Sequence, residues 1–101
     1  MKIGTKLYSQ ACDGEVIVIR ANGIDGAPPE AGGVPLASER GAERHGDADG
    51  DGFPLGKRYE YADPEAGVRI ELLVTAAGTS TLSWQGHPLT VKATRPLPSS
   101  D

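Results

Sequence analysis

The sequence predicts an all-β fold, either a small antiparallel barrel or an open sandwich, with five to seven short strands and one long loop rich in Gly and Asp. Short runs of β-branched and aromatic residues recur between Gly, Pro and Asp turn signals, which is typical of antiparallel strands. No window without Gly or Pro has apolar residues at the i, i+3, i+4, i+7 spacing of an amphipathic helix. The 101 residues, including 14 Gly and 8 Pro, suffice for one domain with a modest core and several external loops.

The N-terminal part predicts two strands. Residues 3–10 alternate loosely between apolar and polar side chains, and residues 12–14 (CDG) have the composition of a turn. Residues 15–20 (EVIVIR) form the clearest strand, because β-branched residues fill its centre and charged residues close both ends. This run is apolar on both faces, which predicts a central strand covered on both sides.

Residues 22–52 form a long excursion in which Gly, Pro and Asp are frequent, with one short strand expected at 33–37. Connections of this length are uncommon in compact domains, and they are usually either functional or disordered. The sequence leaves both interpretations of this segment open.

The segment that follows predicts an antiparallel hairpin. Residues 56–61 (GKRYEY) alternate, which places Tyr59 and Tyr61 on one face. A turn at 63–67 begins with Asp-Pro and ends with Gly. Residues 68–75 (VRIELLVT) then alternate again, as expected for the returning strand.

The C-terminal part predicts a second hairpin. Residues 79–84 (TSTLSW) and 87–93 (HPLTVKA) flank the pair 85–86 (Gln-Gly), a two-residue loop in which Gly accepts a positive φ. We therefore expect a single domain over residues 1–95 and an extended Pro-rich tail over 96–101.

An acidic segment within the long loop (DADGDG) matches the first half of a calcium-binding loop, D-x-D-x-D-G. The alternate carboxylates of Asp47, Asp49 and Asp51 can converge on one hard cation, and the Gly that follows permits the sharp turn. The second half of the pattern is missing, because the twelfth position is Arg58 where such loops have a bidentate Glu. The segment is therefore either a Ca²⁺ site or a solvated acidic loop.

Cys12, His45 and His87 are the only Cys and His residues, and they stand at none of the usual zinc-ligand spacings. A three-ligand zinc site would need the fold to bring them together. Cys12 is either a nucleophile or a small half-buried residue; no basic residue lies within three positions, and Asp13 is expected to raise its pKa. No G-x-S-x-G, phosphate-loop or H-E-x-x-H motif occurs, so we expect no catalytic residue and no organic cofactor.

Four of the five aromatic residues are expected to share one region: Phe53, Tyr59, Tyr61 and Trp84. They are either a partner-binding patch, since aromatic residues dominate interface hot spots, or most of the bulk of the core. Because the chain has only five aromatic residues, we favour the interpretation that they form the core.

Three segments carry a resemblance to a known family: GTKLYSQACDGEVIVIRA near the N-terminus, LGKRYEY in the centre, and ELLVTAAGTSTLSWQGHPLTVKATRPLPSSD at the C-terminus. Through them the chain resembles a family of small, uncharacterised bacterial proteins, mainly from actinobacteria. The resemblance omits residues 38–52. It implies that relatives carry Cys at the positions of Ala31 and Val74, so that Cys12 is what remains of a cysteine set that could have held a metal. It implies no activity.

Composition narrows the class of function. Ten Lys plus Arg against 14 Asp plus Glu give a net charge of −4, which argues against nucleic-acid binding. The longest apolar run, 16–19, is too short to span a membrane, and no apolar signal segment follows the first lysines, so we expect a cytoplasmic location.

We expect a non-catalytic interaction or accessory domain that binds a protein partner through an open sheet edge or forms a homodimer, because a small core leaves edges to cover. Ca²⁺ binding is the alternative.

Overall fold

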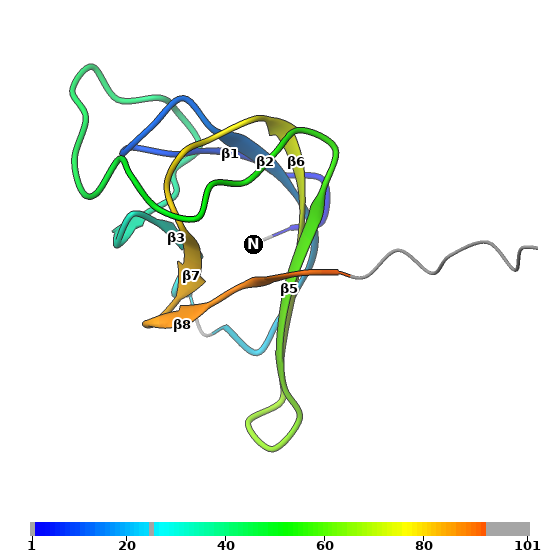
Figure 1. Ribbon diagram of the computed structural model, residues 1–101. Helices are drawn as coiled ribbons and strands as arrows, with labels where there is room; N and C mark the ends of the chain where they lie inside the picture. Colours follow the sequence, from blue (N-terminus) through cyan, green and yellow to red (C-terminus); the bar gives the residue numbers. More distant parts are fainter. Residues whose placement is uncertain (1, 25, 93–101) are drawn as a thin grey trace, which may run out of the picture.

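A computed structural model describes residues 2–24 and 26–92, and it is an all-β open sandwich (Figure 1). Sheet A has the strand order β1-β2-β6-β5-β9 and sheet B has the order β4-β3-β7-β8. All strand pairs are antiparallel, and no helix occurs in the described part of the chain. The strands are β1 (Lys6–Tyr8), β2 (Glu15–Asn22), β3 (Glu30–Ala31), β4 (Val34–Pro35), β5 (Arg58–Asp63), β6 (Val68–Ala76), β7 (Leu82–Trp84), β8 (His87–Pro88) and β9 (Thr90–Val91).

The described part of the chain has nine strands, more than the expected five to seven. Four of them, β3, β4, β8 and β9, are only two residues long, and the sequence does not predict all of them separately. Such short strands leave almost no alternation to detect in the sequence. The strand expected at 33–37 is β4, and the expected returning strand at 87–93 is divided. Its first part, β8, belongs to sheet B and its second part, β9, belongs to sheet A, with the buried Leu89 between them.

The pair β2–β6 forms the centre of sheet A. Val16 lies opposite Val74 and Val18 lies opposite Leu72. All four side chains are almost completely buried, because alternate residues of both strands point into the space between the sheets. The register shifts between Val18 and Arg20, which leaves Ile19 in a β-bulge.

The expectation that residues 15–20 are covered on both sides is wrong. β2 is indeed central, with a strand on each edge, but only one of its faces is buried. Ile17 and Ile19 are half-buried, because they lie on the side of sheet A away from sheet B. The charged residues of β6 share this outer face. Glu71 is only 5% exposed there, since Arg58 (3.4 Å) and Lys92 (3.0 Å) pair with its carboxylate and cover it.

The first expected hairpin is confirmed, and the second is confirmed for β7 and β8. β5 and β6 pair over their full common length, from Arg58 opposite Leu73 to Asp63 opposite Val68. β7 and β8 are joined by residues 85–86, of which Gln85 has φ 47° and Gly86 has φ 82°. Two successive positive φ values are the signature of a type I′ turn, whose twist matches that of the flanking strands.

The aromatic residues supply much of the core. Phe53, Tyr59 and Trp84 are buried, and the partly buried Tyr61 packs against the same cluster. The Trp84 indole N–H donates to the Ala27 carbonyl (2.8 Å), so its polar atom is satisfied in the interior. The core interpretation therefore holds for these three side chains.

The long excursion has two parts. Its first part contributes β3 and β4 to sheet B, and residues 38–52 then run without a strand. The expected tail, 96–101, lies outside the described residues. In the part of the chain that the structure describes, no helix is long and apolar enough to cross a membrane.

Candidate functional site

The three carboxylates of the acidic segment lie on the surface. Asp47, Asp49 and Asp51 are exposed, and the backbone attaches the segment to the body of the protein. The Asp47 N–H donates to the Gly32 carbonyl (2.9 Å), and the Asp51 N–H donates to Thr81 Oγ1 (2.9 Å). Within the part of the chain that the structure describes, no three His, Cys, Asp or Glu side chains are grouped so that they could hold a metal ion. Calcium binding here stays a prediction from the sequence.

Thermal denaturation tests this prediction. Millimolar Ca²⁺ is expected to raise the melting temperature of the wild-type protein, because a ligand that binds only the folded state stabilises it by mass action. Asp49→Ala removes one of the three carboxylates and is expected to abolish the rise. Glu43→Gln removes a charge outside the segment and is expected to retain it. A wild-type melting temperature that is the same with and without calcium overturns the prediction.

The two histidines lie in different surroundings from Cys12. His45 is exposed in the long loop, where its backbone N–H donates to the Gln10 carbonyl (2.7 Å). His87 is exposed on β8, and its ring stacks on Tyr61 with the ring centroids 5.1 Å apart. Cys12 is buried. The zinc arrangement of these residues is not formed in the described structure.

The turn at Cys12 holds the thiol in a polar pocket. Ser9 Oγ accepts the backbone N–H groups of Ala11 (3.0 Å) and Cys12 (3.1 Å), and it lies 3.3 Å from Cys12 Sγ. Burial by itself would raise the pKa of the Cys12 thiol. Hydrogen bonds from the hydroxyls of Ser9 and Ser80 and from the backbone N–H groups of Ser80 and Gly14 outweigh burial and lower the pKa to about 7.

The expected effect of Asp13 on this thiol is therefore wrong. The Asp13 side chain is 86% exposed and pairs with Arg44, so its charge is solvated and compensated. The groups that do lower the pKa of Cys12 include Ser80, which is 68 positions away in the chain. Inspection of the neighbouring sequence could not identify it.

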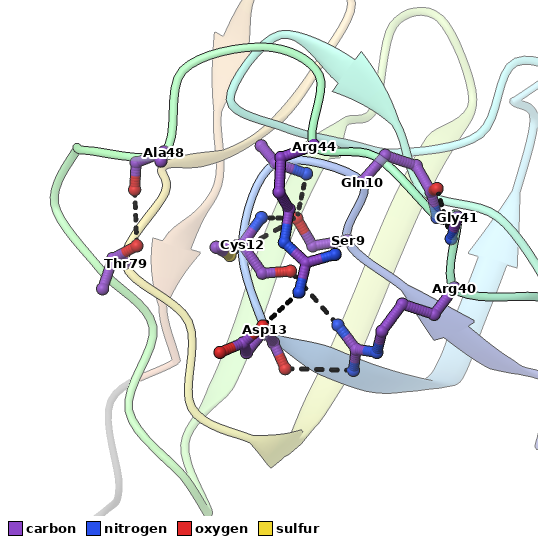
Figure 2. Close-up of polar contacts among 10 residues, drawn as sticks. Ser9, Gln10, Cys12, Asp13, Arg40, Gly41, Arg44, Ala48 and Thr79 are labelled. Atoms are coloured by element: carbon purple, nitrogen blue, oxygen red, sulfur yellow. Dashed lines mark hydrogen bonds and ion pairs between the residues drawn. The ribbon is translucent and has the colours of Figure 1, made fainter.

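A hollow of about 330 Å³ opens beside Cys12, and the long loop forms part of its wall. Figure 2 shows the polar contacts between this loop and the turn that carries Cys12. Arg40 donates from Nη1 to the Cys12 carbonyl (3.2 Å) and from Nη2 to the Asp13 carbonyl (3.1 Å). Arg44, whose guanidinium pairs with the Asp13 carboxylate, lines the hollow together with Ala48 of the same loop. The opposite wall consists of residues 77–79, which follow β6.

This arrangement produces an ionisable but covered thiol. With its pKa lowered to about 7, Cys12 ionises more readily than an ordinary thiol, and the thiolate is the nucleophilic form. The residue is nevertheless only 7% exposed. Of the two charged side chains beside it, Arg44 stays protonated and Asp13 is held in an ion pair with Arg44, so neither is placed to act as a general base. The geometry supports no assignment of Cys12 as a catalytic residue.

Three of the four sheet edges are obstructed. At β1, Tyr8 exchanges both backbone hydrogen bonds with Ala37 of the long loop (2.7 and 3.0 Å), which covers the end of that edge. The edge strands β4 and β8 contain Pro35 and Pro88. Proline cannot donate a backbone hydrogen bond, and it is a common obstacle to pairing at an edge.

The fourth edge is formed by β9 and the second half of β5, and among residues 2–24 and 26–92 neither a proline nor a bridging segment obstructs it. β9 pairs only with the first half of β5. The Lys92 N–H donates to the Arg58 carbonyl (2.8 Å), and because backbone groups alternate along a strand, Ala62 presents its N–H and C=O toward the same side. β9 does not extend that far. Val91 is 50% exposed, and by the same alternation its backbone groups point away from β5.

The positions named by the family resemblance all lie in the core. Cys12, Ala31 and Val74 belong to one cluster of buried residues, in which this chain has two apolar side chains and one thiol. No family model, curated protein or solved structure that we compared with the chain matches it. The resemblance to the actinobacterial family therefore stays a prediction.

Proposed function

We propose that the protein is a small, non-catalytic interaction domain of the cytoplasm that binds a protein partner or a second copy of itself. The partner adds a strand to the stepped edge formed by β5 and β9, on which Val91 of β9 lies one strand farther out than Ala62 of β5. The observation that carries this proposal is the contrast among the four edges. Proline or a bridging loop obstructs the other three, whereas no other part of the described chain pairs with the outward backbone groups of Ala62 and Val91.

Strand addition at this edge would combine two contributions. Backbone hydrogen bonds contribute about 0.5–1.5 kcal/mol each, and a short edge offers only a few of them. Side chains must therefore supply the remaining affinity. Val91, one of the three large exposed apolar residues of the described chain, lies at this edge and would be covered by the added strand.

Size-exclusion chromatography with light scattering, combined with native mass spectrometry, tests the proposal. The wild type is expected to form a dimer at micromolar concentration, and Ala62→Pro is expected to be monomeric. Proline removes an N–H that points to the open edge, so the pairing of β5 with β6 is kept. The matched control Ala62→Val retains the N–H and favours a strand, and it is expected to dimerise like the wild type.

Val91→Lys provides a second variant on the other strand of the edge, because an inserted charge opposes edge-to-edge pairing. It is also expected to be monomeric, and Val91→Thr is its control. Ala62→Pro and Val91→Lys variants that dimerise like the wild type would overturn the assignment of the edge. A monomeric wild type would overturn self-association, and the same two variants would then be compared with the wild type for binding to a candidate partner.

A further inference from the structure

The segment from residue 37 to residue 51, called the strap below, contributes no buried side chain to the protein. Every residue in it is exposed. The residues that anchor its two ends are of the opposite kind, because Leu36 is 3% exposed and Phe53 is completely buried. The strap is therefore a surface segment of fifteen residues that lies between two buried apolar residues.

The first half of the strap is attached by polar groups. Gln10 Oε1 accepts the backbone N–H of Gly41 (2.9 Å), and Gln10 Nε2 donates to the Glu39 carbonyl (2.9 Å). Arg40 donates to the two carbonyls of the Cys12–Asp13 turn, and Arg44 pairs with the Asp13 carboxylate. Figure 2 shows both guanidinium groups directed at this turn.

The second half is attached in the same way. The Asp47 N–H donates to the Gly32 carbonyl (2.9 Å), and its C=O accepts the hydroxyl of Ser80 (2.8 Å). Thr79 donates its hydroxyl to the Ala48 carbonyl. Thr81 Oγ1 accepts the N–H of Asp51, which attaches the end of the strap to the segment that precedes β7.

These contacts differ in kind from those that hold the sheets together. When the strap opens, each of these hydrogen bonds is replaced by a bond to water, so each contributes only a modest net free energy, and exposed ion pairs contribute little. Separating the sheets would instead expose the whole apolar core. Segments with few buried apolar contacts open with low free energy, independently of global unfolding.

We propose that the strap detaches from the two sheets as one unit, without global unfolding, and thereby controls access to the Cys12 thiol. In the closed state Arg44 and Ala48 form one wall of the hollow beside Cys12, and Arg40 bonds across the turn that carries the thiol. Detachment of the strap removes these groups together. The inference does not rest on the proposed function, because the strap shares no residue with the β5–β9 edge.

The rate of thiol labelling with 5,5′-dithiobis(2-nitrobenzoate) measures this opening. The thiolate displaces one coloured thiolate from the reagent, and Cys12 is the sole cysteine, so the signal has a single source. The rate is measured at several urea concentrations below the unfolding midpoint. We expect the wild-type rate at low urea to be nearly independent of urea, because opening the strap exposes little surface.

Two variants weaken different attachments. Arg40→Ala and Gln10→Ala are each expected to raise the labelling rate at zero urea about tenfold, the effect of losing one or two hydrogen bonds of the strap. The control Glu43→Gln changes a strap side chain whose carboxylate forms no hydrogen bond or ion pair in the described structure, and it is expected to label at the wild-type rate. Urea unfolding of each variant separates this effect from a change in global stability.

Two results would overturn the proposal. One is a wild-type labelling rate that rises with urea from the lowest concentrations with the full slope of global unfolding, because Cys12 would then be reached only when the sheets separate. The other is labelling of both Arg40→Ala and Gln10→Ala at the wild-type rate.

Discussion

Replacement of Phe53 by alanine is expected to lower the free energy of unfolding by about 3–5 kcal/mol, as is usual when a buried aromatic ring is removed. The ring is completely buried and fills a space that two glycines leave open. A Cβ atom on Gly14 or on Gly78 would lie only 2.2 Å from ring atoms of Phe53. The backbone on both sides is thus shaped around this ring, and the cavity left by alanine has little means of closing.

Urea unfolding followed by tryptophan fluorescence measures this loss, with Trp84 as the sole tryptophan. The control Phe53→Leu retains an apolar side chain of intermediate size and is expected to cost less than Phe53→Ala. A loss for Phe53→Ala within about 0.5 kcal/mol, the usual range for substitutions on the surface, would contradict the assigned role of the ring.

Gly32→Ala is expected to cost about 2–5 kcal/mol, and Gly33→Ala only about 1–2 kcal/mol, although the two glycines are adjacent. Both have a positive φ, 65° and 82°, so both substitutions incur the strain of the left-handed region. They differ in available space. A Cβ on Gly32 would lie 2.2 Å from the Asp47 carbonyl oxygen and 2.9 Å from the Ala11 Cβ, whereas nothing lies within 4 Å of a Cβ on Gly33.

The difference between the two variants measures the close approach of the strap, and of Ala11, to the turn between β3 and β4. It is measured by urea unfolding of both variants under identical conditions. Equal losses would mean that only the backbone conformation matters and that the strap yields without cost at Gly32.

The regular parts of the fold could be predicted because their signals are local. The alternation in 56–61 and 68–75 identifies the hairpin of β5 and β6, and the Gln-Gly pair identifies the type I′ turn of the next hairpin. β3 could not be found, because Glu30–Ala31 is too short to alternate and follows two prolines. The assignment of β8 and β9 to different sheets depends on tertiary packing of Leu89, which no local pattern encodes.

The surroundings of Cys12 were not predictable for the same reason. The hydroxyl of Ser80 and the guanidinium of Arg40 come from segments that are distant in the sequence, and they reach the thiol only through the pairing of the strands and the path of the strap. The composition of the acidic segment identified Asp47, Asp49 and Asp51 as candidates. Their side chains stay exposed, and the contacts of this segment with the body of the protein are made largely by its backbone.

The pairing of β2 with β6 has a consequence for the protein during its synthesis. Val16 can pair with Val74 only after Val74 has been synthesised, 58 residues later. At translation rates of about 5–20 residues per second, the interval is roughly 3–12 s. Over this interval the β-branched run of β2 has no central partner, and an unpaired segment of high β-propensity is prone to aggregation. Glu15 and Arg20, the charges at the two ends of the run, stand where gatekeeper residues flank aggregation-prone strands, so they are placed to oppose association of the nascent chain before the sheet forms.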